Sequence, residues 1–190
     1  MYQKYQTEAL ILRSRERGEA DKVFALYTRD FGLVWARASG VRRENSKMRY
    51  ALQSGAYIQT GLVRGKRGWR LAGASAMRQF GGNAAGALVF ARICKLVMRL
   101  VQGEEHNAYL FETLADAQAT LSASAHTDLP TVEIVCVARV LYALGYLSED
   151  ALGSALLTHT AHGAAQLAEV EKRRVKLLTS INKALSETQL

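Results

Sequence analysis

Short β-type runs separated by tight turns fill the first 74 residues, and this pattern constrains the fold more than any other feature of the sequence. The runs rich in β-branched, aromatic and aliphatic residues cover 7–13, 21–28, 33–39, 56–63 and 69–74. A charged loop at 14–19 and glycine-containing turns at 30–32 and 64–68 separate several of them. Strands with connections this short pair antiparallel, and five of them in so few residues bury their apolar sides best by closing into a small barrel.

Beyond residue 83 the spacing of apolar residues changes from alternation to the helical period. We expect helices over 84–101, 107–121, 130–144 and 164–185. The run Gly81-Gly82-Asn83 marks the boundary between the two parts. The predicted fold class is α+β: a five-stranded antiparallel OB-fold β-barrel over residues 1–80, followed by an all-α helical domain over residues 81–190.

Basic charge is concentrated in the predicted barrel. The chain has 25 Lys+Arg and 17 Asp+Glu, a formal charge of +8, yet residues 1–80 alone carry +10 and residues 81–190 carry −2. An excess of this size on one module favours a polyanionic partner, with a merely solvated basic surface as the alternative. Because 49% of the residues are hydrophobic, the chain can bury a core, which excludes a disordered polymer.

The sequence shows no sign of export or of a membrane span. The N-terminal residues lack a continuous apolar segment. The most apolar stretch, 84–101, is amphipathic, because three cations share one helical face: Arg92, Lys95 and Arg99. Cys94 and Cys136 are 42 residues apart and support neither a disulfide framework nor a zinc site. We therefore expect a cytoplasmic protein that needs no metal and no cofactor.

Alternation within residues 33–39 gives the sharpest local prediction, because every second side chain shares a face. Arg37 does not belong inside a small barrel without a partner, so its face, which includes Trp35, is expected outside. An exposed indole beside a guanidinium can stack on an unpaired base while the cation meets phosphate. The alternative is that Trp35 covers a seam against the helical domain. The same parity places Arg70 outside and Trp69 in the core.

Two glycine-flanked basic connections, 40–49 and 64–70, supply the other cations that could follow a phosphate backbone. Together with the residues of the third strand they make up the predicted nucleic-acid-binding set: Trp35, Arg37, Arg42, Arg43, Lys47, Arg49, Arg64, Lys66, Arg67 and Arg70.

Signals for catalysis are weak. Glu16, Glu19 and Asp21 could hold Mg²⁺ in a hydrolase or nuclease, but arginines interleave with them and favour self-neutralisation. The P-loop, G-x-S-x-G and H-E-x-x-H motifs do not occur. We predict a non-enzymatic protein. An OB-type RNA-binding protein of translation or ribosome assembly is the alternative, because the same cations serve any polyanion.

Several segments together resemble the RecO family of bacterial recombination mediators. They stand in family order along the first part of the chain: ALIL (9–12), GEADK (18–22), LYTRDFG (26–32), ARASGVRR (36–43) and ALQ (51–53). A fainter resemblance continues over 107–121 and 137–146. The order and spacing of these segments carry the resemblance, since none of them is diagnostic alone.

This resemblance implies a non-enzymatic mediator of DNA repair and recombination whose OB-fold binds single- and double-stranded DNA and anneals strands. It also implies contact with RecR and with the acidic C-terminal tail of single-stranded DNA-binding protein, indirect action on RecA, and a place at the bacterial nucleoid. Arg92, Lys95 and Arg99 are a candidate site for that tail, with a solvated, locally paired helix face as the alternative. Many family members carry a four-cysteine zinc module after an LGY segment, but residues 148–163 contain no cysteine, so no metal is carried over.

Overall fold

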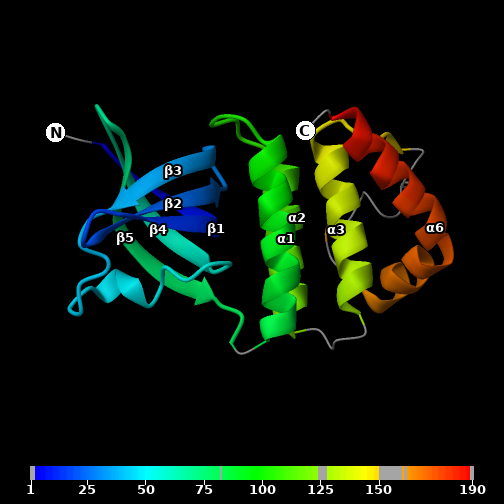
Figure 1. Cartoon of the computed structure of the whole chain (residues 1–190), viewed down its shortest axis with the longest axis horizontal. Coiled ribbons are helices and arrows are strands. Elements are labelled where there is room, and N and C mark those ends of the chain that lie inside the picture. The colour runs from blue at the N-terminus through cyan, green and yellow to red at the C-terminus, as the bar shows by residue number, and fades with distance from the viewer. Residues whose placement is uncertain (1–2, 82, 124–127, 150–159, 161, 189–190) are drawn as a thin grey trace. The chain divides into compact units, whose positions relative to one another are not determined.

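The computed structural model describes the chain except residues 1–2, 82, 124–127, 150–159, 161 and 189–190. Most of the segment 148–163, which contains no cysteine, lies outside the described residues. The chain forms two compact units. The first combines Met1–Phe80 with Gln102–Phe111, and the second combines Gly81–Val101 with Glu112–Leu190 (Figure 1).

The first unit is a closed five-stranded barrel, which confirms the predicted OB-fold. Its strands are β1 (Lys4–Arg17), β2 (Asp21–Thr28), β3 (Gly32–Ala38), β4 (Tyr57–Gly65) and β5 (Gly68–Arg78). They close in the order β1-β2-β3-β5-β4. Four contacts between strands are antiparallel, but β3 and β5 pair parallel, so the expectation of antiparallel strands throughout was wrong at this seam. A ring with an odd number of strands cannot alternate direction everywhere.

Strand β1 is longer than the sequence pattern predicted, since it continues to Arg17 through most of the expected charged loop. The extension pairs with β2 through Arg15↔Val23, Glu16↔Lys22 and Arg17↔Asp21. Two of these three pairs join opposite charges, which favours the hairpin although it has almost no apolar periodicity. Gly18, with a φ of 63°, stands in the turn that connects the two strands.

Inside the barrel, alternate residues of each strand form one core cluster, and the cluster includes Val34, Ala36 and Ala38 as predicted. Trp69 is only 4% exposed, which confirms its predicted inward direction. The connection between β3 and β4 contains a short helix, η1 (Lys47–Arg49). Val41 and Leu52 of this connection belong to the same core and Met48 of η1 packs against it, so the connection is packed on the barrel.

Residues 102–111, which follow the first helix in the sequence, pack on the barrel. Glu104 makes two side-chain contacts there: Oε1 accepts a 2.9 Å hydrogen bond from Trp69 Nε1, and Oε2 pairs with Arg64 at 3.0 Å. The neighbouring Glu105 backbone comes so close to Gly32 that a Cβ at Gly32 would lie 2.2 Å from the Glu105 carbonyl oxygen. Gly32 also has a φ of 62°, so both the turn and this contact require glycine.

The described residues of the helical part contain α1 (Ala84–Leu100), α2 (Ala108–Ala123), α3 (Leu129–Ala143) and α6 (Ala164–Glu187). The predicted helices are confirmed to within two residues at each end. Asn83 caps α1 by accepting the Gly86 N–H at 2.9 Å, and a Cβ at Gly86 would lie 2.0 Å from the Leu121 carbonyl oxygen, so α1 and α2 pack closely.

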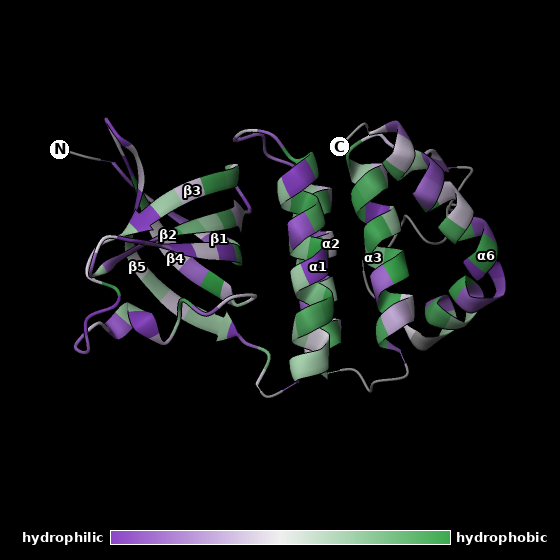
Figure 2. Cartoon of the chain, in the orientation of Figure 1, coloured by the Kyte–Doolittle hydropathy of each residue, from purple (hydrophilic) through white to green (hydrophobic). Residues whose placement is uncertain are grey.

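Hydrophobic residues run along much of α1 and α3 (Figure 2), and α3 and α6 share an apolar cluster. Both cysteines are free and buried in this unit. Among the described helices, none is both long and apolar enough to cross a membrane.

Candidate nucleic-acid interface

The β1–β2–β3 sheet presents a basic outer face. Strand register aligns Arg15 and Arg37 on either side of Val23, and it places Trp35 next to Ala25. Side chains alternate along each strand, so Arg15 and Arg17 share the face that carries Trp35 and Arg37. This arrangement confirms that Trp35 and Arg37 point away from the core.

Trp35 is the exposed aromatic residue of this face, with 45% of its surface accessible. The guanidinium of Arg15 lies over its ring, 5.4 Å from the ring centroid. A cation held against an indole combines a stacking plane with a phosphate partner. Arg15 was not among the predicted site residues, because residues 14–19 were expected to form a loop and only the β1 extension places its side chain beside Trp35.

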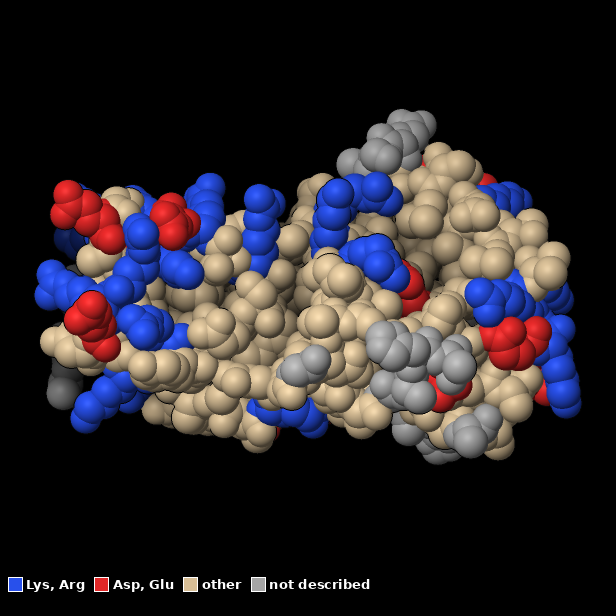
Figure 3. Space-filling model, turned by 60° about the horizontal axis from the view of Figure 1, so that its bottom comes forward, with Lys and Arg blue, Asp and Glu red and all other residues tan. Residues whose placement is uncertain are grey.

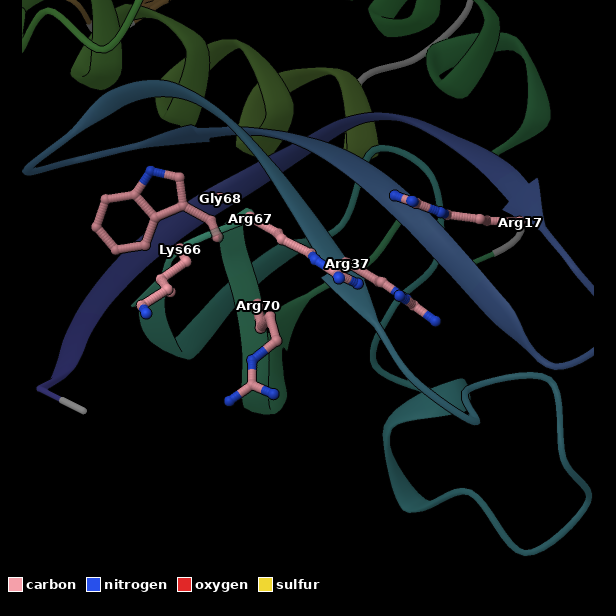
Figure 4. Close-up of a pocket in the computed structure, with 8 residues that line it drawn as sticks. Arg17, Arg37, Lys66, Arg67, Gly68 and Arg70 are labelled. Carbon is pink, nitrogen blue, oxygen red and sulfur yellow. The ribbon is translucent and has the colours of Figure 1, made fainter. Parts of the chain in front are cut away.

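A concave pocket of about 390 Å³ adjoins this face. Figure 4 shows basic side chains that reach it from β1, β3, β5 and the β4–β5 turn; its lining consists of Arg17, Arg37, Gly65, Lys66, Arg67, Gly68, Trp69 and Arg70. Arg17 adds a residue that the sequence analysis did not select. Within the described part of the chain, Arg17, Lys66 and Arg67 have no ion-pair partner. Such cations are available to an anion.

Asp21 holds the pocket residue Arg37 in place through hydrogen bonds. Arg37 Nε donates to Asp21 Oδ2 at 2.8 Å, and the Gly40 N–H donates to Asp21 Oδ1 at 2.7 Å. These bonds, the Gly40 one first, lower the pKa of Asp21 below its ordinary value. Asp21 therefore orients Arg37 and holds the start of the β3–β4 connection.

The acidic group that could have supported a nuclease is not assembled. Asp21 is engaged by Arg37 and Gly40, and Glu16 pairs with Arg42 at 3.2 Å. Within the described ranges, no three His, Cys, Asp or Glu residues come together as a metal site. Arginine pairing thus neutralises two of the three carboxylates.

The β3–β4 connection carries the next four predicted residues. Arg42 also donates to the Gly18 carbonyl at 3.3 Å, whereas Arg43, Lys47 and Arg49 are exposed. The sequence analysis missed Tyr50, which is 68% exposed with the Arg49 guanidinium 5.2 Å from its ring centroid. An aromatic residue after a cation in a polar loop was the available signal.

Arg64 has a structural role. Its guanidinium pairs with Glu104 at 3.0 Å and lies 5.1 Å from the centroid of the Trp69 ring. It therefore ties residues 102–111 to the barrel. The remaining predicted residue, Arg70, lines the pocket. In the view of Figure 3 the barrel carries many Lys and Arg side chains with a few acidic ones among them.

The cations predicted on α1 are exposed, but they are not equivalent. Arg92 donates to both carboxylate oxygens of Glu133 on α3, at 2.7 and 2.6 Å. Lys95 and Arg99 have no ion-pair partner among the described residues. Arg92 thus connects two helices, and the other two cations are available to a ligand.

The barrel and its basic outer face define the class of the first unit, an OB-fold module suited to a polyanion. Residues 1–78 match the family model described as Recombination protein O N terminal. Similar proteins named DNA repair protein RecO come from Heliobacterium modesticaldum (32% identity over 153 residues, 78% of this chain and 54% of the relative) and Dehalococcoides mccartyi (28% over 131 residues, 67% and 51%). By this similarity the N-terminal barrel, residues 1–78, is a RecO N-terminal domain. The chain spans about half the length of these two relatives.

Proposed function

We propose that this chain is a DNA-binding mediator of DNA repair and recombination that acts without catalysis. The observation that carries the proposal is the continuity between the Trp35–Arg15 pair and the cationic pocket on one face of the barrel. Relatives named DNA repair protein RecO support DNA as the polyanion.

The geometry supports binding of a single strand. Its phosphates meet Arg17, Arg37, Lys66 and Arg67, while an unpaired base stacks against Trp35. Phosphate contacts of this kind hold the strand in place without reading its sequence. Neutralising the backbone reduces the repulsion between two complementary strands, and annealing follows from this without a covalent step.

The similarity to RecO proteins supports a proposal about partners. We propose contact with RecR, recognition of the C-terminal tail of single-stranded DNA-binding protein, and indirect help in loading RecA on DNA that this protein coats. Lys95 and Arg99 on α1 are available for the acidic tail, since both are exposed and have no ion-pair partner among the described residues.

The test has two arms. Parallel titrations of single-stranded DNA and of RNA oligomers should show binding to DNA at least as tight as binding to RNA, and a clear preference for structured RNA would replace DNA repair by the RNA-binding alternative. In the second arm, complementary DNA oligomers coated with single-stranded DNA-binding protein should anneal faster with the chain present. Removing the tail of the coating protein should abolish the gain.

A further inference from the structure

The described barrel carries a second basic surface, on the opposite side of the β1–β2–β3 sheet from Trp35. In the β1–β2 hairpin, Arg15 and Arg17 point to the outer face, so Glu16 and its partner Lys22 point to the other face. The β3–β4 connection covers this other face. We call residues 40–56 with Lys22 the loop surface, and we call the Trp35 face with its pocket the outer surface.

The loop surface has a defined backbone. Arg42 N donates to the Ala20 carbonyl at 2.9 Å, and Gly55 N donates to the Ile11 carbonyl at 2.9 Å, so both ends of the connection are bonded to the barrel. Val41 and Leu52 are buried in the barrel core. The basic side chains of the connection are therefore displayed from a fixed position.

The loop surface contains its own concave site of about 200 Å³. It is lined by Glu16, Lys22, Phe24, Val41, Arg42, Arg49, Leu52 and Gln53, and it shares no residue with the pocket of the outer surface. The loop surface contains five basic residues and one carboxylate, that of Glu44, and Glu16 also lines its concave site. The net charge of this surface is thus positive.

Both surfaces carry the same chemical pair, an exposed aromatic ring with a guanidinium over it. On the outer surface the pair is Trp35 with Arg15, and on the loop surface it is Tyr50 with Arg49. The Tyr50 carbonyl accepts a 2.8 Å hydrogen bond from Gln79 Nε2, and the Arg49 carbonyl accepts one from Gln53 at 2.8 Å. The backbone at Tyr50 is therefore anchored while its ring remains exposed.

From these observations we infer that one chain holds two nucleic-acid strands at once, one on the outer surface and one on the loop surface. The inference rests on the proposed function and deepens it. Protein between two strands keeps their phosphates apart, and charge interactions beyond roughly 8 Å are largely screened at physiological salt. Strands longer than the bound segments extend past the barrel and meet there at an effective concentration of the order of millimolar, which accelerates pairing.

Native mass spectrometry of the full chain tests this inference, because it counts chains and oligomers in each complex. Two non-complementary 12-nucleotide DNA strands of different mass serve as ligands, so pairing between them contributes nothing. The wild-type chain should form a complex of one chain with two strands. A loop-surface variant (Lys47→Glu with Arg49→Glu) and an outer-surface variant (Arg17→Glu with Arg67→Glu) should each form mainly the complex with one strand, with at least a tenfold loss of the two-strand species.

The matched control carries the same change of charge on α6, as Lys172→Glu with Lys176→Glu, and should still hold two strands. Circular dichroism of every variant excludes unfolding as the cause of a loss. A wild-type chain that saturates with one strand would overturn the inference and leave the proposed function standing. Loss of both strands in either surface variant would also overturn it, because the two surfaces would then form one site. A wild-type chain that binds no strand would contradict the proposed function itself.

Discussion

At the scale of single residues, the two tryptophans of the barrel serve opposite purposes. Trp69 is 4% exposed and donates its indole N–H to Glu104, whereas Trp35 is 45% exposed and contacts Arg15. A buried indole with a satisfied N–H stabilises the fold. We therefore expect any change in intrinsic fluorescence on ligand binding to come mainly from Trp35.

Replacing Trp35 by alanine should weaken binding of a single strand, because the stacking plane is lost. Stacking on an aromatic side chain contributes about 1–3 kcal/mol per base, so we expect a loss in affinity of about 5- to 150-fold. Fluorescence anisotropy with a labelled oligomer measures it. Trp35→Phe keeps a ring and should recover most of the affinity; equal losses in both variants would show that the indole acts through packing.

His162 should make the stability of the helical unit depend on pH. Burial, assisted by the charge of Arg139, lowers the pKa of His162 to about 4 from 6.5. In the unfolded chain the His162 imidazole takes up a proton near pH 6.5, whereas in the folded state it does so only near pH 4. The contribution of neutral His162 to the free energy of unfolding is present above about pH 6.5. The free energy of unfolding falls by about 2–3 kcal/mol as the pH is lowered to about 4.5.

Urea unfolding at pH 7.5 and pH 4.5 measures this loss. His162→Gln removes the titrating group and should flatten the difference between the two pH values. His106, which is exposed, provides the matched control, and His106→Gln should keep the wild-type dependence. An unchanged slope in His162→Gln would assign the pH dependence to other groups.

At the scale of elements, α1 combines a packed face with an exposed cationic face. Its buried side includes Val89, Ile93 and Val97, and its exposed side carries the three cations. The double hydrogen bond from Arg92 to Glu133 fastens α1 to α3. An exposed ion pair contributes at most about 1 kcal/mol, so the helix packing does not depend on it alone.

We expect charge reversal at Lys95 and Arg99 to weaken binding of the isolated acidic tail peptide of single-stranded DNA-binding protein at least tenfold. Binding of naked DNA should stay near the wild-type level, because these residues lie outside the barrel. Calorimetric titration of the peptide and anisotropy with DNA measure the two affinities. Arg92→Ala is the comparison, with little effect on the peptide. Wild-type peptide affinity in the double reversal would place the tail site elsewhere.

At the scale of the whole molecule, the two parts of the chain differ in the sign of their net charge. The net charge of +10 in residues 1–80 predicts that the barrel is the source of polyanion affinity, since residues 81–190 carry −2. The affinity should therefore fall steeply with salt, by about 0.7 in the log–log slope for each phosphate neutralised on a single strand.

Charge reversal at Arg42 and Arg43 should weaken DNA binding to all sequences alike. Losing two phosphate contacts should reduce the salt slope by about 1.4, and a base-reading site would instead change preferences among sequences. Titrations of several unrelated oligomers between low and moderate salt measure both quantities. Unchanged affinity and slope would move the site away from the β3–β4 connection.

Local patterns determined the strands, the helices and the direction of most barrel side chains. Alternation in β3 was enough to place Trp35 and Arg37 outside, because adjacent side chains of a strand must point to opposite faces. The change of period near residue 83 separated barrel from helices, because a helix and a strand expose an apolar face at different spacings. Such inferences use only neighbours in the chain.

Tertiary structure alone decided what comes together from distant positions. Barrel closure brought Arg17 to one pocket with Lys66 and Arg67, about fifty residues away in the sequence, and chain folding brought Glu104 to Trp69. These contacts depend on strand register, on the parallel β3–β5 seam and on the return of residues 102–111 to the barrel. None of the three leaves a periodic signal, because long-range pairing is set by the packing of the whole core and not by the order of residues within one element.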